Sequence, residues 1–183
     1  MPEYSAKSTL GARAEGACVS DEVQGVVSVS RRIDASASTI FGILADPARH
    51  PEIDGSGSVR TGGDSAVISA VGDVFVMKMH FPHLGDYEMN NLVVEFEPDR
   101  RITWEPAPGR GHPRANEDDP TAERLGHRWS YSLTPEGSEA TTVTETYDCR
   151  RAPEEFQVGM NYGRQWLEAM DATLERLEQL CTS

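Results

Sequence analysis

Three side chains from two neighbouring segments of the sequence, Glu145, His127 and Tyr131, are of the types that transfer or steer protons. If Val143 and Tyr147 face the inside of the protein, the two-residue period of a strand places Glu145 inside with them. Burial raises the pKa of a carboxyl group unless a cation or hydrogen bonds stabilise its charge, and a general acid or base at neutral pH needs such a pKa. In the opposite register the intervening threonines face inward and Glu145 faces water. In a third interpretation Glu145 makes a structural hydrogen bond to a neighbouring strand.

The segment that begins at His127 places His127, Trp129 and Tyr131 on one face of a second strand, which is expected to pair with the strand of Glu145. A histidine beside a carboxylate can be oriented and charged by it, and a tyrosine can polarise a carbonyl group. Trp129 and Tyr131 are interpreted as lining a cavity, and the alternative is an ordinary core, in which each ring fills space and its one polar atom is bonded. The pattern predicts Glu145, His127 and Tyr131 as candidate catalytic residues.

A metal site is not expected. His80 and His83 form an HxxH pattern, to which Asp86 or His112 could add a third ligand. Pro82 prevents a helix from presenting both histidines on one face, so they are interpreted as surface histidines near a cavity mouth. The sequence has no glycine-rich phosphate loop, GxSxG motif or HExxH motif, and it predicts no cofactor.

Alternation of apolar and polar residues predicts strands at 23–33, 58–61, 74–80, 87–97, 101–105, 127–133 and 141–148. Lys78 is expected to face water, so the alternate residues of its strand, Phe75, Met77 and Met79, face inward. Glu95 and Glu97 are also expected to face water, so Asn90, Leu92, Val94 and Phe96 of the next strand face inward. Asn90 would then be suited to orient a ligand, because its amide both donates and accepts. The strand residues expected to contact a ligand are Phe75, Met77, Met79, Asn90, Leu92, Trp104, Trp129 and Tyr147.

One long amphipathic helix is expected from Pro153 to the C-terminus, with apolar residues at alternating steps of four and three. Gly159 and Gly163 weaken such a helix by about 1 kcal/mol each. Their missing side chains leave room either for a ligand or for close packing on a sheet. A free coiled coil is the rival interpretation, which fewer than four heptads disfavour. The helix residues expected to contact a ligand are Met160, Tyr162, Gly163 and Trp166.

Two short helices are expected after the first strand. Ser36 is a good N-cap for the first, and Asp46-Pro47 ends it and begins a second, which His50-Pro51 breaks. Residues 1–22 are small and polar and are interpreted as a flexible N-terminal arm, which leaves 23–183 as one domain. Residues 106–126 are expected to form a long loop.

The segments that identify a family are RIDAS at 32–36, ADPARHP at 45–51, VVEFEP at 93–98 with Trp104 after it, LGHRWSY at 125–131 and VTETYD at 143–148. Over roughly residues 25–180 the chain resembles the SRPBCC superfamily, also called START-like or helix-grip proteins, and within it the bacterial polyketide cyclase/dehydrase-like branch. The resemblance implies an α+β helix-grip fold, in which a curved antiparallel sheet of about seven strands surrounds a long C-terminal helix, with two short helices after strand 1.

The resemblance implies a shared hydrophobic cavity and no shared catalytic set, so three functions are considered. The first is the binding of a small hydrophobic or aromatic ligand, such as a lipid or polyketide, between the sheet and the C-terminal helix. The second is a polyketide cyclase or dehydratase that uses Glu145 or His127 as general acid or base, with Tyr131 steadying an oxyanion. The third is an acidic module that docks on another protein.

Composition narrows the partners and the compartment. The chain of 183 residues has a formal net charge of −13, which repels nucleic acid and anionic membrane surfaces. No run approaches the roughly 18 apolar residues of a membrane span, and the N-terminus does not have the pattern of a secretory signal. Three cysteines without CxxC spacing argue against a disulfide framework, so the cytoplasm is the expected compartment. A homodimer is compatible with the sequence, although no exposed apolar stripe supports one.

Overall fold

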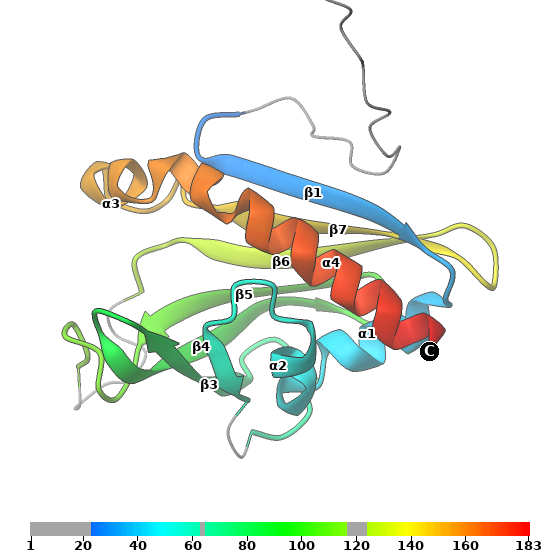
Figure 1. The fold of residues 1–183 in the computed structure, drawn as a ribbon, viewed down its shortest axis with the longest axis horizontal. Coiled ribbons are helices and arrows are strands. Elements are labelled where there is room, and N and C mark those ends of the chain that lie inside the picture. The colour runs from blue at the N-terminus through cyan, green and yellow to red at the C-terminus, as the bar shows by residue number, and fades with distance from the viewer. Residues whose placement is uncertain (1–22, 63–64, 117–123) are drawn as a thin grey trace, which may run out of the picture.

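The structure is a computed structural model that describes residues 23–62, 65–116 and 124–183. Seven strands form one antiparallel sheet in the order β1-β7-β6-β5-β4-β3-β2. Helices follow β1 and β7, and the C-terminal helix α4 lies across the sheet (Figure 1). The strands are β1 (Val26–Ile33), β2 (Val59–Thr61), β3 (Val74–Phe81), β4 (Gly85–Glu97), β5 (Arg101–Pro108), β6 (Arg128–Pro135) and β7 (Thr141–Asp148). This is the helix-grip arrangement expected from the sequence.

The short helices after β1 begin where the sequence predicts. The hydroxyl of Ser36 accepts a hydrogen bond from the backbone N–H of Thr39 and caps the first helix, and Asp46 caps the second in the same way through Ala48. Their apolar residues are buried against the sheet. The helices are α1 (Ala37–Leu44), the 3₁₀ turn η1 (Pro47–Arg49) and α2 (His50–Ile53).

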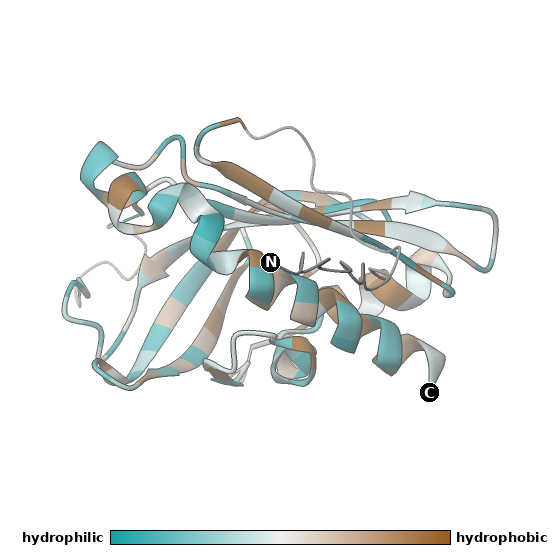
Figure 2. Cartoon of the chain, turned by 45° about the horizontal axis from the view of Figure 1, so that its top comes forward, coloured by the Kyte–Doolittle hydropathy of each residue, from teal (hydrophilic) through white to brown (hydrophobic). Residues whose placement is uncertain are grey.

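Helix α4 (Leu167–Thr182) holds the inner face of the sheet, the face that carries Val27 and Tyr147, through apolar packing and ion pairs. Its buried side chains include Met170 and Leu174. Arg31 of β1 donates to Glu178 at 2.8 Å and to Asp171 at 3.3 Å, which ties the sheet edge to the helix. Apolar and polar residues alternate along the strands, as expected for a sheet with one covered face (Figure 2).

The prediction of one uninterrupted C-terminal helix is wrong. The segment divides into α3 (Glu154–Gly159), η2 (Asn161–Trp166) and α4, with non-helical backbone at Tyr162 (φ 53°) and Gly163 (φ 90°). A Cβ atom on Gly163 would lie 2.8 Å from Cδ1 of Tyr147, so only glycine allows this close approach at a positive φ. Apolar spacing continues through the break, which is why the spacing did not reveal it.

The predicted inward orientation of Asn90 and Leu92 is also wrong. A register shift between Val93 and Glu95 places a bulge in β4, and a bulge reverses which residues face inward on its two sides. Phe96 packs against the core as expected, whereas before the bulge Tyr87, Met89 and Asn91 face the inner side. Counting back from Glu95 and Glu97 across the bulge gave the wrong face.

The predicted arm at 1–22 and part of the predicted 106–126 loop lie outside the described residues. Strand β5 extends to Pro108, so the first residues assigned to that loop belong to the sheet. Among the described residues, no helix is long and apolar enough to cross a membrane.

Candidate functional site

A cavity of about 670 Å³ lies between the inner face of the sheet, α2 and the segment from α3 to α4. Its volume is in the range of pockets that hold small organic ligands. Aromatic rings and methionines make up much of its wall: Met77, Met79, Phe81, Tyr87, Met89, Trp104, Trp129, Tyr147, Phe156, Met160 and Trp166. The methionines come from strands and from the α3–η2 junction, so flexible apolar side chains border the space on two sides.

All three tryptophans of the sequence line this cavity. The ring centroid of Trp129 lies 4.7 Å from that of Tyr147 and 5.6 Å from that of Trp166, in tilted and edge-to-face geometry. The ring centroid of Trp104 lies 5.8 Å from that of Tyr131. These rings support one another at the distances that aromatic pairs prefer, which gives the cavity a continuous apolar wall.

One part of the cavity contains a cluster of polar residues. Tyr131 and Glu145 are direct cross-strand partners on β6 and β7, and the Tyr131 hydroxyl donates to Oε1 of Glu145 at 2.9 Å. Glu145 is 4% exposed, and its Oε2 has no hydrogen-bond partner among the described residues. The inward orientation of Glu145, left open by the sequence, is therefore the one adopted.

Burial raises the pKa of Glu145 to about 8, although the hydrogen bond from Tyr131 acts in the opposite direction and the charge of Asp54 adds to the increase. The same burial, with Glu145 beside it, raises the pKa of Tyr131 well above its usual value. Both groups are therefore predominantly neutral at pH 7. A neutral carboxyl group can donate a hydrogen bond as well as accept one.

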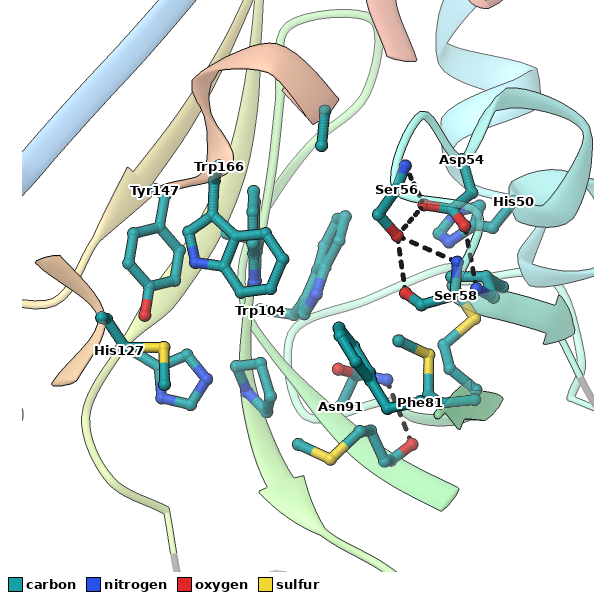
Figure 3. A pocket seen from close by; sticks show the side chains of 18 of the residues that line it. His50, Asp54, Ser56, Ser58, Phe81, Asn91, Trp104, His127, Tyr147 and Trp166 are labelled. Carbon is teal, nitrogen blue, oxygen red and sulfur yellow. Dashed lines mark hydrogen bonds between the residues drawn. The ribbon is translucent and has the colours of Figure 1, made fainter. Parts of the chain in front are cut away.

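Asp54 and two serines form the other side of this polar part. The Asp54 carboxylate accepts hydrogen bonds from Ser56 N at 3.0 Å, Ser56 Oγ at 2.6 Å and Val59 N at 2.8 Å. The hydroxyls of Ser56 and Ser58 lie 2.6 Å apart (Figure 3). We call Asp54, Ser56, Ser58, Tyr131 and Glu145 the polar end of the cavity.

His127 lies away from the polar end, beside Tyr147 and Trp166, on the side of the cavity opposite Asp54 (Figure 3). Its ring centroid is 4.9 Å from that of Phe156 and 5.9 Å from that of Tyr147. Burial lowers the pKa of His127 to about 4, against a weaker opposing effect of Glu105, and Nδ1 has no partner among the described residues. The ring is therefore neutral at pH 7. We call His127, Trp129, Tyr147, Phe156 and Trp166 the aromatic end.

The predicted catalytic residues are thus divided between the two ends. The structure brings Tyr131 to Glu145 but not His127, because four residues of extended chain separate His127 from Tyr131 by about 13 Å. The expectation that a carboxylate orients and charges His127 on the paired strand does not hold for Glu145. Only the pair Glu145–Tyr131 forms a connected polar group.

Seven of the residues predicted to contact a ligand line the cavity: Met77, Met79, Trp104, Trp129, Tyr147, Met160 and Trp166. Phe75 lies in the core with its ring 5.4 Å from that of Trp104, so it supports the wall without forming it. Asn90, Leu92, Tyr162 and Gly163 are not among the lining residues. Gly163 instead allows η2 to pack closely on Tyr147.

Several residues that line the cavity are not among the predicted ligand contacts, and the sequence predicted the segment His50–Ile53 only near the cavity rim. Asn91 takes the place predicted for Asn90, and its amide donates to the backbone carbonyls of Phe75 at 3.3 Å and Met89 at 3.2 Å. His50 stacks on Trp104 at 5.8 Å, and its Nε2 donates to the Leu44 carbonyl at 2.8 Å. Burial lowers the pKa of His50. The only signal for the Asp54–Ser58 loop was its turn-like run of Asp, Gly and Ser, which favours bonds from side chains to the backbone.

The histidines of the HxxH pattern do not come together as metal ligands. His80 Nδ1 lies 2.7 Å from Oδ1 of Asp86 at the exposed end of the β3–β4 hairpin, whereas His83 lies at the cavity rim. Within residues 23–62, 65–116 and 124–183, no three His, Cys, Asp or Glu side chains are grouped as a metal site requires.

A curved antiparallel sheet that holds a C-terminal helix over an apolar cavity is the START-like, or helix-grip, fold. The chain belongs to the family described as "Polyketide cyclase / dehydrase and lipid transport", whose model matches residues 24–182. It is 34% identical over 134 residues to the uncharacterized protein Rv0088 of Mycobacterium tuberculosis. The matched region covers 73% of this chain and 52% of that protein. The chain therefore spans about half the length of the curated relatives it matches.

Solved structures show the same fold at low sequence identity. Protein Ms6760 from Mycobacterium smegmatis has a TM-score of 0.64 at 16% identity, covering 90% of this chain and 96% of that one. A START superfamily protein from the same organism has a TM-score of 0.56 at 17% identity, covering 85% of this chain and 98% of that one.

Proposed function

We propose that the protein binds a small apolar or aromatic molecule in the cavity between the sheet and α4. The observation that carries this proposal is a space of about 670 Å³ walled by tryptophans, tyrosines and methionines. Most ligand pockets combine such a wall with a few polar groups that fix orientation, as the polar end does here. The family description, which includes lipid transport, supports the same class of ligand.

The wall is suited to ligands of varied shape. Transfer of apolar surface out of water contributes about 25 cal/mol per Å², so a ligand that covers much of the wall can bind without any ion pair. Met77, Met79 and Met89 can change rotamer to fit different outlines, whereas Trp104 and Trp129 offer rigid faces for stacking.

Two measurements test the proposal. Mass spectrometry of the purified protein under native conditions is expected to show a bound small molecule. Titration with the neutral fluorescent probe N-phenyl-1-naphthylamine is expected to show saturable binding. The variant Met79→Trp should weaken probe binding at least tenfold because the larger side chain occupies the cavity. Lys78→Trp, on the exposed outer face of the same strand, is the matched control and should leave binding unchanged.

Two results would count against ligand binding. One is the absence of both a co-purified molecule and a saturable probe signal. The other is equal weakening by Met79→Trp and Lys78→Trp, which would place the probe on the protein surface and not in the cavity.

A cyclase or dehydratase activity is the second candidate, favoured by one observation. Glu145 lines a cavity large enough for a substrate, and its pKa of about 8 suits proton transfer near neutral pH. Tyr131 would steady developing charge on a substrate oxygen. Cyclisation of an aryl-substituted 1,5-diketone by intramolecular aldol reaction, followed by absorbance, would test this. Loss of the rate enhancement in Glu145→Gln would support it, and a rate equal to that in buffer would reject it.

The remaining expectations stay proposals. The acidic interaction module rests on the net charge of −13 alone. A cytoplasmic location, a homodimer and the division into an arm at 1–22 and one domain at 23–183 are proposed on the sequence arguments given above.

A further inference from the structure

The starting observation is a buried polar atom without a partner, on a residue that lines the cavity. Tyr131 donates to Oε1 of Glu145, while Oε2 is buried and has no hydrogen-bond partner among the described residues. In a neutral carboxyl group the oxygen that does not accept from Tyr131 can carry the proton and donate it. A buried donor without an acceptor is unfavourable, so a ligand oxygen at this place would remove a cost present in the free protein.

The charges around the polar end disfavour an anion. Asp54 lies close enough to raise the pKa of Glu145 through its charge. His50 is buried, and its Nε2 proton is used by the Leu44 carbonyl. Arg176 donates to the backbone carbonyl of Asp54, but it is not among the residues that line the cavity. A carboxylate placed here would meet the charge of Asp54 without a cation in the adjoining wall, and burying a charge under those conditions is costly.

The basic residue in the cavity wall lies far from Glu145. Among the described lining residues, Arg114 is the only Lys or Arg. Tyr131 pairs with Ile102 near the start of β5, whereas Arg114 follows the other end of that strand. Six residues of strand span about 20 Å, so Arg114 cannot neutralise a ligand charge at Glu145.

We propose that the polar end binds an uncharged acceptor oxygen of the ligand, such as a ketone or ester carbonyl, and excludes a carboxylate. The carbonyl accepts a hydrogen bond from the free side of the Glu145 carboxyl group, which Tyr131 holds in place. This inference rests on the proposed ligand-binding function and specifies the chemical class of ligand that enters with its polar group inward.

Four naphthalenes of nearly equal size test it by displacement of N-phenyl-1-naphthylamine at pH 7. They are 2-acetylnaphthalene, 2-ethylnaphthalene, 2-naphthoate and 2-(1-aminoethyl)naphthalene. The ketone is expected to bind about tenfold more tightly than the hydrocarbon, the value of one net hydrogen bond. It should also bind at least tenfold more tightly than the carboxylate. Tighter binding of the amine than of the ketone would overturn the inference in favour of a cation site.

Variants locate the effect. In Glu145→Met the preference for ketone over hydrocarbon should disappear, whereas Glu145→Gln keeps a donor and should retain it. Because each variant is measured with both ligands, a general loss of folding lowers both affinities and leaves their ratio interpretable. Asp54→Asn should narrow the gap between ketone and carboxylate by removing one negative charge.

The outcomes separate the two levels of the proposal. If the probe and all four naphthalenes fail to bind, ligand binding in the cavity is wrong and the inference falls with it. If ketone and hydrocarbon bind equally in the wild type, or if Glu145→Met leaves their ratio unchanged, the cavity binds ligands but the assigned role of Glu145 is wrong.

Discussion

Each end of the cavity contains a titratable group that burial keeps neutral, but burial raises the pKa of one group and lowers that of the other. At the polar end burial keeps the proton on Glu145, and at the aromatic end burial keeps the proton off His127. Glu145 retains one hydrogen bond, from Tyr131, whereas His127 lies against the rings of Phe156 and Tyr147. The cavity is thus uncharged along most of its wall, with a hydrogen-bond donor at one end and aromatic faces at the other.

This difference has a consequence for stability. A carboxyl group with a raised pKa in the folded protein makes the protein less stable as pH rises, because only the unfolded chain can release the proton easily. A histidine with a lowered pKa makes the protein less stable as pH falls, because only the unfolded chain can take up the proton easily. The two ends are therefore expected to destabilise the fold in opposite pH directions.

The largest expected effect is at the polar end. The unfolded chain releases the Glu145 proton near pH 4.5 and the folded protein only near pH 8. Between pH 5 and 8 the free energy of unfolding of the wild type should fall by roughly 4 kcal/mol relative to Glu145→Gln, which cannot ionise. Urea unfolding of both proteins at several pH values measures the difference. A difference that stays constant over this interval would show that Glu145 is ionised in the folded protein.

The effect at the aromatic end is expected to be somewhat smaller and of opposite sign. His127 takes up a proton near pH 6.5 in the unfolded chain and near pH 4 in the folded protein. As pH falls from 6.5 to 4, the free energy of unfolding of the wild type should fall by roughly 3 kcal/mol relative to His127→Phe, which keeps a ring beside Phe156. The same unfolding experiments on the acid side provide the measurement. Parallel curves for the two proteins would contradict the burial of a neutral imidazole.

A third test addresses the backbone that shapes the aromatic end. Gly163→Ala should lower the free energy of unfolding by about 2 kcal/mol, because a Cβ atom at φ 90° would meet Tyr147 at 2.8 Å. Gly159→Ala is the matched control: a Cβ there meets no atom within 4 Å, and alanine should stabilise by up to about 1 kcal/mol. Thermal unfolding of the two variants and the wild type measures both changes in stability. Equal stability of both would mean that the chain does not break at Gly163.

How far the sequence predicted the two ends depends on local regularity. Alternation along 127–133 and 141–148 predicted two paired strands with Tyr131 on one face, and it left the orientation of Glu145 open. Because β6 and β7 pair without a bulge, the period of two holds along both strands, and the structure places Tyr131 opposite Glu145. The same reasoning failed in β4, where one bulge makes Asn91 face inward and not Asn90. A bulge has no dependable signature in side-chain pattern, so every residue counted across it is assigned to the wrong face.

The predictions for the C-terminal helix and for the Asp54 loop failed for a different reason. The 3–4 apolar spacing runs through the break at Tyr162 and Gly163, since residues on both sides still pack on the sheet. Gly163 was noticed, but whether its missing side chain makes room for a ligand or for a neighbour depends on Tyr147, a contact between distant parts of the chain. Asp54 reaches the cavity through bonds within its own turn, which sequence alone predicts only as a turn.

The smallest predicted effect is that of the hydrogen bond between Tyr131 and Glu145, measured apart from the effect of burying Glu145. Tyr131→Phe removes the donor to Glu145 Oε1 and keeps the ring, so the free energy of unfolding at pH 6 should fall by about 1 kcal/mol. Because that hydrogen bond lowers the pKa of Glu145, its loss should move the pH at which Glu145 ionises further above about 8. A double-mutant cycle with Glu145→Gln measures the coupling. Zero coupling together with an unchanged ionisation pH would mean that Tyr131 and Glu145 are neighbours without a bond, and the polar end would then be two separate groups.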